Sequence, residues 1–197
     1  NFTPARYAGS VDSDASFLTL FGSWGLGASG FVEGSAGYER HDGTYRRNSV
    51  FQESTRTRPQ VDVRVAGDAV RTVWWTSVNG GFDLNREALS YGPYAGLTAT
   101  RSKVDAYTER DQNGSGLNMR FDDADRDSLL SHVGVRARYA FSGAAGVFVP
   151  QARVEYQHEF EDDPQSITSR FALDASDTQY ALVGGGLDQD FIVAGFS

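Results

Sequence analysis

Two residue patterns in this sequence have spacings known from catalytic or ligand-binding sites, and the first is a glycine triplet. Gly25, Gly27 and Gly30 reproduce the G-x-G-x-x-G spacing of a dinucleotide-binding loop. Such a loop binds pyrophosphate only where it joins a strand to the N-terminus of a helix. The residues after Gly30 alternate as those of a strand do, so we interpret the three glycines as a turn.

The second pattern has the spacing of a calcium-binding loop. An EF-hand loop lies between two amphipathic helices, and neither flank of this segment is predicted to be helical. We therefore expect a solvated outer loop rather than a metal site, and we interpret the acidic runs 122–127 and 159–163 as solvated charge. The residues at calcium-ligand spacing are Asp111, Asn113, Ser115, Gly116 and Asp122.

Histidines and serines, which metal binding or hydrolysis would require, show no such spacing. His41, His132 and His158 are the only histidines, and no two of them have the spacing of metal ligands. No serine lies in the G-x-S-x-G pattern of a nucleophile elbow. We therefore expect no catalytic residues, no metal and no cofactor, and hence a protein that is not an enzyme.

The composition excludes further classes of protein. The chain has 197 residues, enough for one domain, and it has no cysteine, which rules out a disulfide scaffold and a cysteine-ligated zinc site. Its net charge of −8 argues against nucleic-acid binding. No apolar run reaches the roughly 18 residues of a membrane helix. A membrane β-barrel stays consistent with this composition, because each of its strands needs only about ten residues of alternating hydrophobicity.

Two-residue alternation of apolar and polar side chains is the main signal in the chain, and it is strongest from Ser128 to Glu161. Before the glycines at 143–146 the apolar side chains fall mostly on odd positions, and after them on even positions. Successive side chains of a strand point to opposite faces, so this segment is predicted to be a hairpin with one apolar and one charged face. Both arms exceed the roughly five or six residues of an ordinary strand.

Similar strands are predicted along the rest of the chain. Residues 61–65 also alternate and are expected to extend a neighbouring strand, whereas residues 9–14 are predicted to be a loop. The other predicted strands span 15–24, 30–40, 68–84, 88–107 and 178–191.

The connections between these strands alternate in length. In an up-and-down sheet, alternate connections lie at opposite ends, so all the long polar loops are predicted at one end and all the tight turns at the other. Outer-membrane barrels have this asymmetry, with short periplasmic turns and long outer loops. The predicted turns are 25–29, 85–87 and 143–146, and the predicted long loops are 41–60, 108–127 and 161–177.

Charged side chains on the polar face of the hairpin are the candidate pore-lining residues. A ladder of mixed charge would give a passing polypeptide a polar wall, and it would also hold neighbouring strands together. If the turn centres between residues 144 and 145, Arg136 faces Arg153. By the same register, Arg138 faces Gln151. The candidate pore-lining residues are Arg136, Arg138, Arg153, Glu155, Gln157 and Glu159.

Aromatic side chains near the ends of the apolar faces are interpreted as membrane-interface anchors. Outer-membrane barrels carry girdles of aromatic residues at both interfaces. Packing between two sheets of a water-soluble protein is the alternative explanation. The candidate anchors are Trp24, Trp74, Tyr91, Tyr139, Tyr156 and Phe160.

Several short blocks carry a resemblance to a known family. They lie in order between about Phe17 and Leu187, at 34–38 with Arg46 and Arg47, 91–97, 104–109, 127–134 and 149–160. In order and spacing the sequence resembles the C-terminal translocator domain of autotransporters, the type V secretion barrels of Gram-negative bacteria.

The resemblance implies one outer-membrane domain over residues 1–197, an all-β, transmembrane, antiparallel, up-and-down β-barrel. Barrels of this family have twelve strands, of which about eight are visible here, so we expect the domain to be incomplete at both ends. The implied function is to anchor and help export an N-terminal passenger through a polar pore. The implied partners are outer-membrane lipid, the passenger segment and the barrel assembly machinery.

Two other functions remain as hypotheses. The chain could be a small porin or adhesion-type barrel whose outer loops bind a ligand. It could also be the membrane anchor of an enzyme, such as an esterase, whose catalytic passenger lies outside this sequence.

Overall fold

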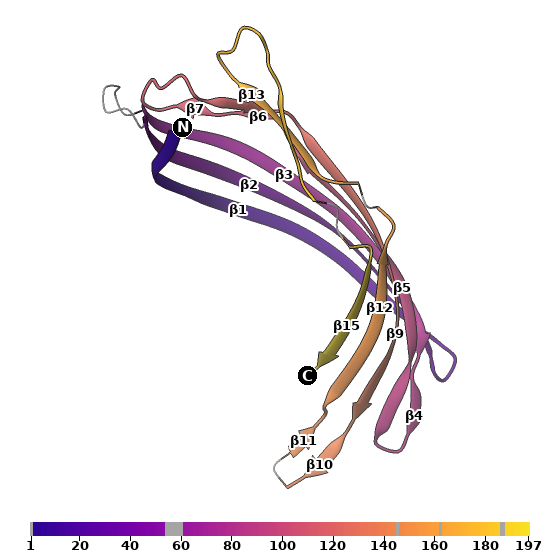
Figure 1. Ribbon diagram of the computed structural model, residues 1–197. Helices are drawn as coiled ribbons and strands as arrows, with labels where there is room; N and C mark the ends of the chain where they lie inside the picture. Colours follow the sequence, from indigo (N-terminus) through magenta and orange to yellow (C-terminus); the bar gives the residue numbers. More distant parts are fainter. Residues whose placement is uncertain (1, 54–60, 145, 162, 186–187) are drawn as a thin grey trace.

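The computed structural model describes residues 2–53, 61–144, 146–161, 163–185 and 188–197. These residues form antiparallel strands and turns, and no helix occurs among them (Figure 1). Within this part of the chain, therefore, no helix is long and apolar enough to span a membrane. The prediction of an all-β antiparallel fold is confirmed.

The main sheet consists of strands that pair with one another in chain order, as in an up-and-down sheet. The short strands β4 (Leu84–Arg86) and β7 (Arg110–Asp111) pair alongside β5 and β3. Among the described residues, β1 and β15 form the two edges of this sheet. Its main strands are β1 (Phe2–Leu26), β2 (Gly30–Glu53), β3 (Val61–Phe82), β5 (Leu89–Val104), β9 (Ala124–Tyr139), β12 (Gln151–Glu159) and β15 (Asp190–Phe196).

Shorter strands form two smaller sheets at opposite ends of the main sheet (Figure 1). At the turn end, β10 (Phe141–Gly143) pairs with β11 (Gly146–Phe148). At the loop end lies a four-stranded sheet in the order β14-β13-β8-β6. Its strands are β6 (Tyr107–Thr108), β8 (Met119–Phe121), β13 (Ser166–Phe171) and β14 (Tyr180–Val183).

The strand register gathers most apolar side chains of the main strands on one face, with Phe17 and Phe21 of β1 on the other. Val133 lies opposite Ala95 on β5 and opposite Tyr156 on β12. The apolar side chains there are exposed; Val133 and Val154, for example, are 55% and 52% exposed. An exposed apolar face that spans a whole sheet is compatible with lipid as its solvent, and not with water.

The height of the apolar face matches the thickness of a bilayer. On β5 it runs from Tyr91 to Ala99, and Arg101 ends it at the loop end. On β2 the corresponding boundary lies between Tyr38 and Arg40. A membrane-spanning strand needs roughly 9–11 tilted residues, so this apolar segment is long enough to cross the hydrocarbon.

Strands β1, β2 and β3 continue well beyond this apolar segment at the loop end. The predicted loops at 9–14 and 41–53 are therefore wrong, because both segments belong to the β1–β2 ladder, with Val11 opposite Tyr45. Residues 54–60 of the predicted loop lie outside the described residues. The extended parts of β1 and β2 have polar side chains on both faces, so they lack the apolar alternation by which the other strands were recognised. Residues 61–65 of β3 do alternate, and they extend that strand as predicted.

The extended part of the sheet contains the most deeply buried apolar side chains that the structure describes. Val63 and Val65 of β3 are 0% and 1% exposed. They lie on the polar-side face of the sheet, where β6, β7 and the residues up to β8 fold back over β3. A small water-excluding core therefore lies beyond the membrane-spanning segment, where its burial is driven by the ordinary hydrophobic effect.

Two other boundaries differ from the sequence prediction. The predicted loops 108–127 and 161–177 contain short strands, and β9 begins within the first of them at Ala124. The predicted strand 178–191 is instead divided into β14 and the start of β15, and its residues 186–187 lie outside the described residues. Short strands that pair only with other loops leave little periodicity in the sequence.

Two of the three predicted tight turns are confirmed, and the third is displaced, because residues 85–86 belong to β4 and the turn follows at 87–88. β1 ends at Leu26 and β2 begins at Gly30, so the G-x-G-x-x-G glycines lie at a strand-to-strand turn. Gly143 pairs with Gly146, which centres the hairpin turn between residues 144 and 145 as predicted. Residue 145 itself lies outside the described residues.

An introduced charge should be costly on the apolar face and tolerated on the polar face, which gives a first prediction. We expect Val133→Arg to lower the free energy of unfolding from lipid vesicles by roughly 2–4 kcal/mol, because the guanidinium would face hydrocarbon. His132→Arg, one position away on the polar face, should cost much less. Urea titration in vesicles measures both values. Equal losses for the two variants would contradict the assignment of the faces.

Candidate pore lining

The six candidate pore-lining residues come from two adjacent strands and share the polar face of the sheet. Arg136 and Arg138 belong to β9, and the other four belong to β12. The register places Arg136 opposite Arg153, as predicted from the turn. Like charges directly opposite one another destabilise a sheet, so neighbouring groups have to compensate them.

Asp83 compensates the positive charge of Arg136. The Arg136 guanidinium donates from Nη2 to both Asp83 carboxylate oxygens at 3.1 and 3.2 Å, and from Nε at 3.3 Å. Arg138 lies farther away, with Nη2 3.9 Å from the same carboxylate. Asp83 directly follows β3, on the opposite side of β5 from these arginines. The sequence placed Asp83 on the polar face of its strand but gave no signal that it would meet Arg136.

Glu155 is held by neighbours on both sides. The Tyr94 hydroxyl donates a 2.5 Å hydrogen bond to its carboxylate, and the Gln157 amide donates another. Arg153 approaches the same carboxylate only to 4.0 Å. Glu155 is 6% exposed, so these donors compensate a buried negative charge. Tyr94 was not among the predicted site residues, although the alternation of β5 places it on the polar face.

Glycines beside these residues allow large side chains to lie flat across the sheet. A Cβ added at Gly81 would lie 2.9 Å from the Phe31 ring, and one at Gly134 would lie 2.7 Å from Glu155. The guanidinium carbon of Arg136 stands 4.5 Å from the centre of the Phe31 ring. Cation–π attraction therefore adds to the ion pair with Asp83 in fixing Arg136.

Glu159 closes the row of charged residues toward the loop end. Its carboxylate accepts hydrogen bonds from the Ser128 hydroxyl at 2.6 Å and from the Leu129 backbone N–H at 2.8 Å. A third bond comes from the Glu161 backbone N–H at 3.1 Å. Because Ser128 and Leu129 belong to β9, these hydrogen bonds join β12 to β9 through the side chain of Glu159.

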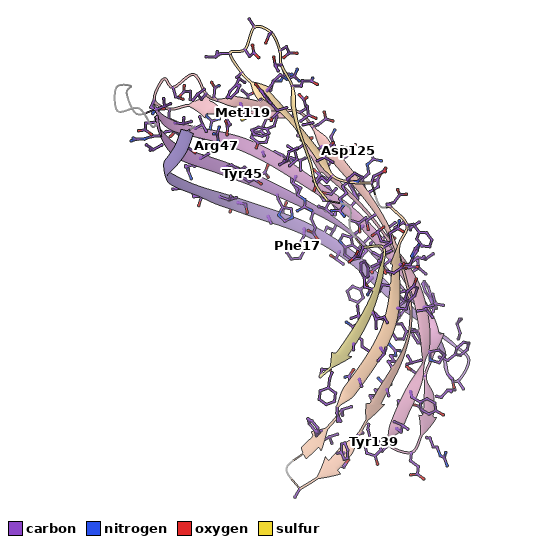
Figure 2. All side chains as sticks on the ribbon, viewed as in Figure 1. Phe17, Tyr45, Arg47, Met119, Asp125 and Tyr139 are labelled. Atoms are coloured by element: carbon purple, nitrogen blue, oxygen red, sulfur yellow. The ribbon has the colours of Figure 1, made fainter. Side chains whose placement is uncertain are left out.

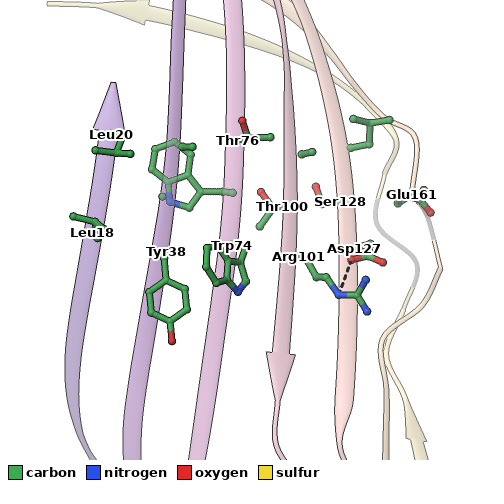
Figure 3. Close-up of a pocket in the computed structure, with 15 residues that line it drawn as sticks. Leu18, Leu20, Tyr38, Trp74, Thr76, Thr100, Arg101, Asp127, Ser128 and Glu161 are labelled. Atoms are coloured by element: carbon green, nitrogen blue, oxygen red, sulfur yellow. Dashed lines mark ion pairs between the residues drawn. The ribbon is translucent and has the colours of Figure 1, made fainter. Parts of the chain in front are cut away.

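The candidate interface aromatic residues lie on the opposite, apolar face. Trp74 packs against Tyr38 with ring centres 4.4 Å apart, and the Phe160 ring meets the His158 ring edge-on at 4.6 Å. Figure 3 shows Trp74 beside a shallow hollow of about 640 Å³ that Leu18 and Leu20 also line. Five of the six are exposed side chains on strands, at Trp24, Trp74, Tyr91, Tyr139 and Tyr156.

The outward face changes from apolar to charged at the same level. Arg101, which lies opposite Trp74, approaches Asp127 to 3.8 Å at the rim of the hollow (Figure 3). Ion pairs of this kind, such as Arg40 with Asp42 at 2.9 Å, continue beyond it. The aromatic rings therefore stand at a boundary between hydrocarbon-compatible and water-compatible surface.

A segment between β5 and β9, which we call the cap, folds over the extended strands at the loop end. The cap comprises residues 105–123. Its Glu109 receives 2.8 Å bonds from Arg47 of β2 and from the Met119 backbone N–H. Figure 2 places Arg47 and Met119 together at this end and Tyr139 at the other. Tyr107 lies over Gly67, where a Cβ would be 2.8 Å from its ring.

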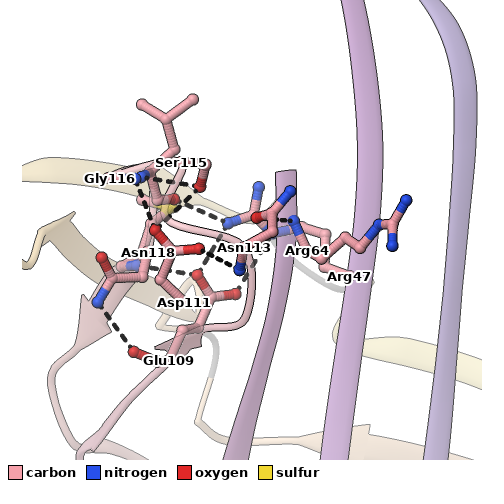
Figure 4. Close-up of polar contacts among 10 residues, drawn as sticks. Arg47, Arg64, Glu109, Asp111, Asn113, Ser115, Gly116 and Asn118 are labelled. Atoms are coloured by element: carbon pink, nitrogen blue, oxygen red, sulfur yellow. Dashed lines mark hydrogen bonds and ion pairs between the residues drawn. The ribbon is translucent and has the colours of Figure 1, made fainter. Parts of the chain in front are cut away.

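The residues with calcium-ligand spacing take part in folding the cap. The Asp111 carboxylate accepts hydrogen bonds from the backbone N–H groups of Gly116 at 2.6 Å and Asn113 at 3.2 Å (Figure 4). These bonds hold the pKa of Asp111 below its usual value, with the Gly116 bond the largest cause. Asp122 instead pairs with Arg170 on β13. Among the described residues, no cluster of three metal-ligating side chains occurs.

The three histidines lie apart from one another in different environments. His41 pairs with Glu39 at 3.3 Å, and His158 on the apolar face pairs with Asp190 at 2.8 Å. His132 lies on the polar face, with its ring 5.9 Å from that of Tyr94.

Comparison with known families agrees with the two-faced sheet. The family described as "Autotransporter beta-domain" matches residues 1–197, the whole chain. The chain belongs to this family. It is an outer-membrane β-barrel translocator domain of Gram-negative bacteria, and its family context includes a passenger segment. In outer-membrane barrels the apolar face of each strand lies against lipid and the polar face lines the lumen.

A curated relative of this β-domain is an "Uncharacterized protein in trpE-trpG intergenic region" from Pseudomonas putida. The two are 30% identical over 121 residues, which cover 60% of this chain. The match spans about 19% of that relative's length.

Charge reversal of Arg136 gives a second prediction. We expect Arg136→Glu to change the single-channel conductance in planar bilayers, because it leaves Asp83 uncompensated on the lumen wall. Insertion into the bilayer should be unchanged. Arg101→Glu, on the outward face, is the matched control and should leave conductance unaltered. An unchanged conductance in the Arg136 variant would contradict a lumenal position for this side chain.

The hydrogen bonds to Asp111 give a third prediction, on pH. Because its folded-state pKa is lowered, their contribution is present above the ordinary pKa of about 3.9 and is lost as the pH falls through the lowered value. A nitroxide at Gln112→Cys should be restricted at neutral pH and gain mobility below about pH 4. Electron paramagnetic resonance measures this change.

Substitution of Asp111 separates this effect from general acid unfolding. Asp111→Asn should leave the label more mobile at neutral pH and reduce its pH dependence. Asp174→Asn is the matched control, since Asp174 accepts similar bonds from Ser176 and Thr178 in another loop. Identical label mobility in all three proteins would refute the role given to Asp111.

Proposed function

We propose that the charged face of this domain lines a water-filled path for its passenger, and that the domain itself catalyses no bond-making reaction. The observation that carries the proposal is the opposition of the two faces. The same strands present exposed apolar side chains on one side and a compensated ladder of charge on the other.

The composition of the polar face suits the transit of a polypeptide. Glu155 and Glu159 are buried and hydrogen-bonded, so they stiffen the wall, while the arginines beside them stay about half exposed. A wall of ionic and hydroxyl groups offers an unfolded chain little apolar surface on which to collapse. The function supported is passive conduction and anchoring.

We also propose that the barrel assembly machinery inserts the domain. The exposed apolar face would aggregate in water. It therefore needs a partner that shields the strands until they reach lipid.

A fourth prediction tests whether export depends on insertion of this domain. The full-length natural protein is expressed in a Gram-negative host, and protease is added to intact cells. We expect His132→Arg to preserve surface exposure of the passenger and Val133→Arg to reduce it severalfold, since only Val133 faces lipid. Depletion of the barrel assembly machinery should also abolish exposure. A passenger that reaches the surface while the domain fails to insert would contradict the proposal.

A further inference from the structure

Two arginines of the lumen wall, Arg138 and Arg153, are incompletely neutralised. Their nearest carboxylate oxygens lie 3.9 and 4.0 Å away, beyond hydrogen-bonding distance. Within the described part of the chain, neither guanidinium has a hydrogen-bond acceptor. Their side chains are 53% and 57% exposed.

The carboxylates nearest to these arginines are already engaged. Asp83 accepts three hydrogen bonds from Arg136. Glu155 accepts bonds from Tyr94 and Gln157. Arg138 and Arg153 therefore retain free donors in the fork geometry that binds carboxylates in a bidentate manner.

A hollow of about 490 Å³ lies in front of these two arginines. Its lining includes three arginines and one aspartate, so its charge is positive in a chain whose net charge is −8. Gly195 of β15 keeps the hollow open, because a Cβ there would lie 3.2 Å from Nε of Arg153. Tyr94, on the same face of the sheet, adds aromatic surface to the lining.

The hollow lies at the turn end of the sheet. Asp83 and Ser90, on either side of the tight β4 turn, belong to its lining. In outer-membrane barrels the short turns are periplasmic, so the hollow would lie at the mouth that a passenger meets first.

We propose that Arg138 and Arg153 form a carboxylate-binding site at this mouth, which takes acidic side chains of a polypeptide. The proposal rests on the proposed function, since the polypeptide would be the passenger segment in transit. Half-exposed guanidinium groups beside the Tyr94 ring suit a carboxylate carried on a chain better than a small free anion, which would gain nothing from that ring.

The test measures block of the ion current through the protein in planar bilayers. Ten-residue glutamate and lysine peptides, free glutamate and inorganic phosphate are added separately to the turn side. For the unsubstituted protein we expect the glutamate peptide to block at the lowest concentration. Block by free glutamate or phosphate at the same concentration would overturn the proposal in favour of a free-anion site, and stronger block by the lysine peptide would also overturn it.

Variants distinguish binding at Arg138 and Arg153 from a general effect of the charge of the lumen. Arg138→Gln with Arg153→Gln should require about tenfold more glutamate peptide for half block, because charge-assisted hydrogen bonds are lost. The charge-conserving pair Arg138→Lys and Arg153→Lys should lie between this variant and the unsubstituted protein, since lysine lacks the planar fork. Arg71→Gln, at the loop end of the same face, is the control. Its current should be half blocked at the same glutamate-peptide concentration as that of the unsubstituted protein. Equal half-block concentrations for the double glutamine variant and the unsubstituted protein would refute the site.

The outcome is distinguishable from failure of the proposed function. If the unsubstituted protein conducts and exports its passenger but shows no preference for the glutamate peptide, only the carboxylate site is refuted. If it neither conducts nor exports, the proposed function itself fails.

The reversal potential under a salt gradient provides a second readout. It should change in the double glutamine variant, because loss of two cations from the mouth should lower the selectivity of the pore for anions.

Discussion

The structure depends on one geometric constraint, that neighbouring residues of a strand point to opposite faces of a sheet. In an outer-membrane barrel the two faces meet different solvents, lipid on one side and the lumen on the other. Trp74 and Trp75 illustrate the consequence, since the first packs with Tyr38 on the apolar face and the second lies over Gly37 on the polar face. A shift of register by one residue would place charge in hydrocarbon, so the alternation fixes the pairing of every strand.

Charge on the lumen side is arranged by the same register. Arg136 and Arg153 lie opposite each other, which is unfavourable in isolation, and Asp83 and Glu155 on neighbouring rows compensate them to different degrees. Small residues make this possible, because glycines leave room for ring and guanidinium groups to lie across adjacent strands. A wall built in this way is rigid where carboxylates are buried, and it can bind ligands where arginines retain free donors.

The sequence predicted the two faces because lipid favours apolar side chains at every second position of a membrane-spanning strand. The pattern is weakest in β1, where Phe17 and Phe21 lie on the polar face. It correctly placed the hairpin turn between residues 144 and 145, and from that the register of Arg136 and Arg138. It did not reveal that β1 and β2 continue past the membrane, since Val11 and Tyr45 lie among polar residues on both faces. It also could not identify Asp83 or Tyr94 as partners of the hairpin, because their contacts depend on pairing between distant strands.

The fluorescence of two adjacent tryptophans tests the central claim most directly. The chain has three tryptophans, so variants that keep only Trp74 or only Trp75 require two substitutions to phenylalanine each. In vesicles, brominated lipid should quench Trp74 strongly and Trp75 weakly, because only Trp74 faces hydrocarbon. Equal quenching of the two, or stronger quenching of Trp75, would contradict the assignment of the apolar face to lipid and of the charged face to the lumen.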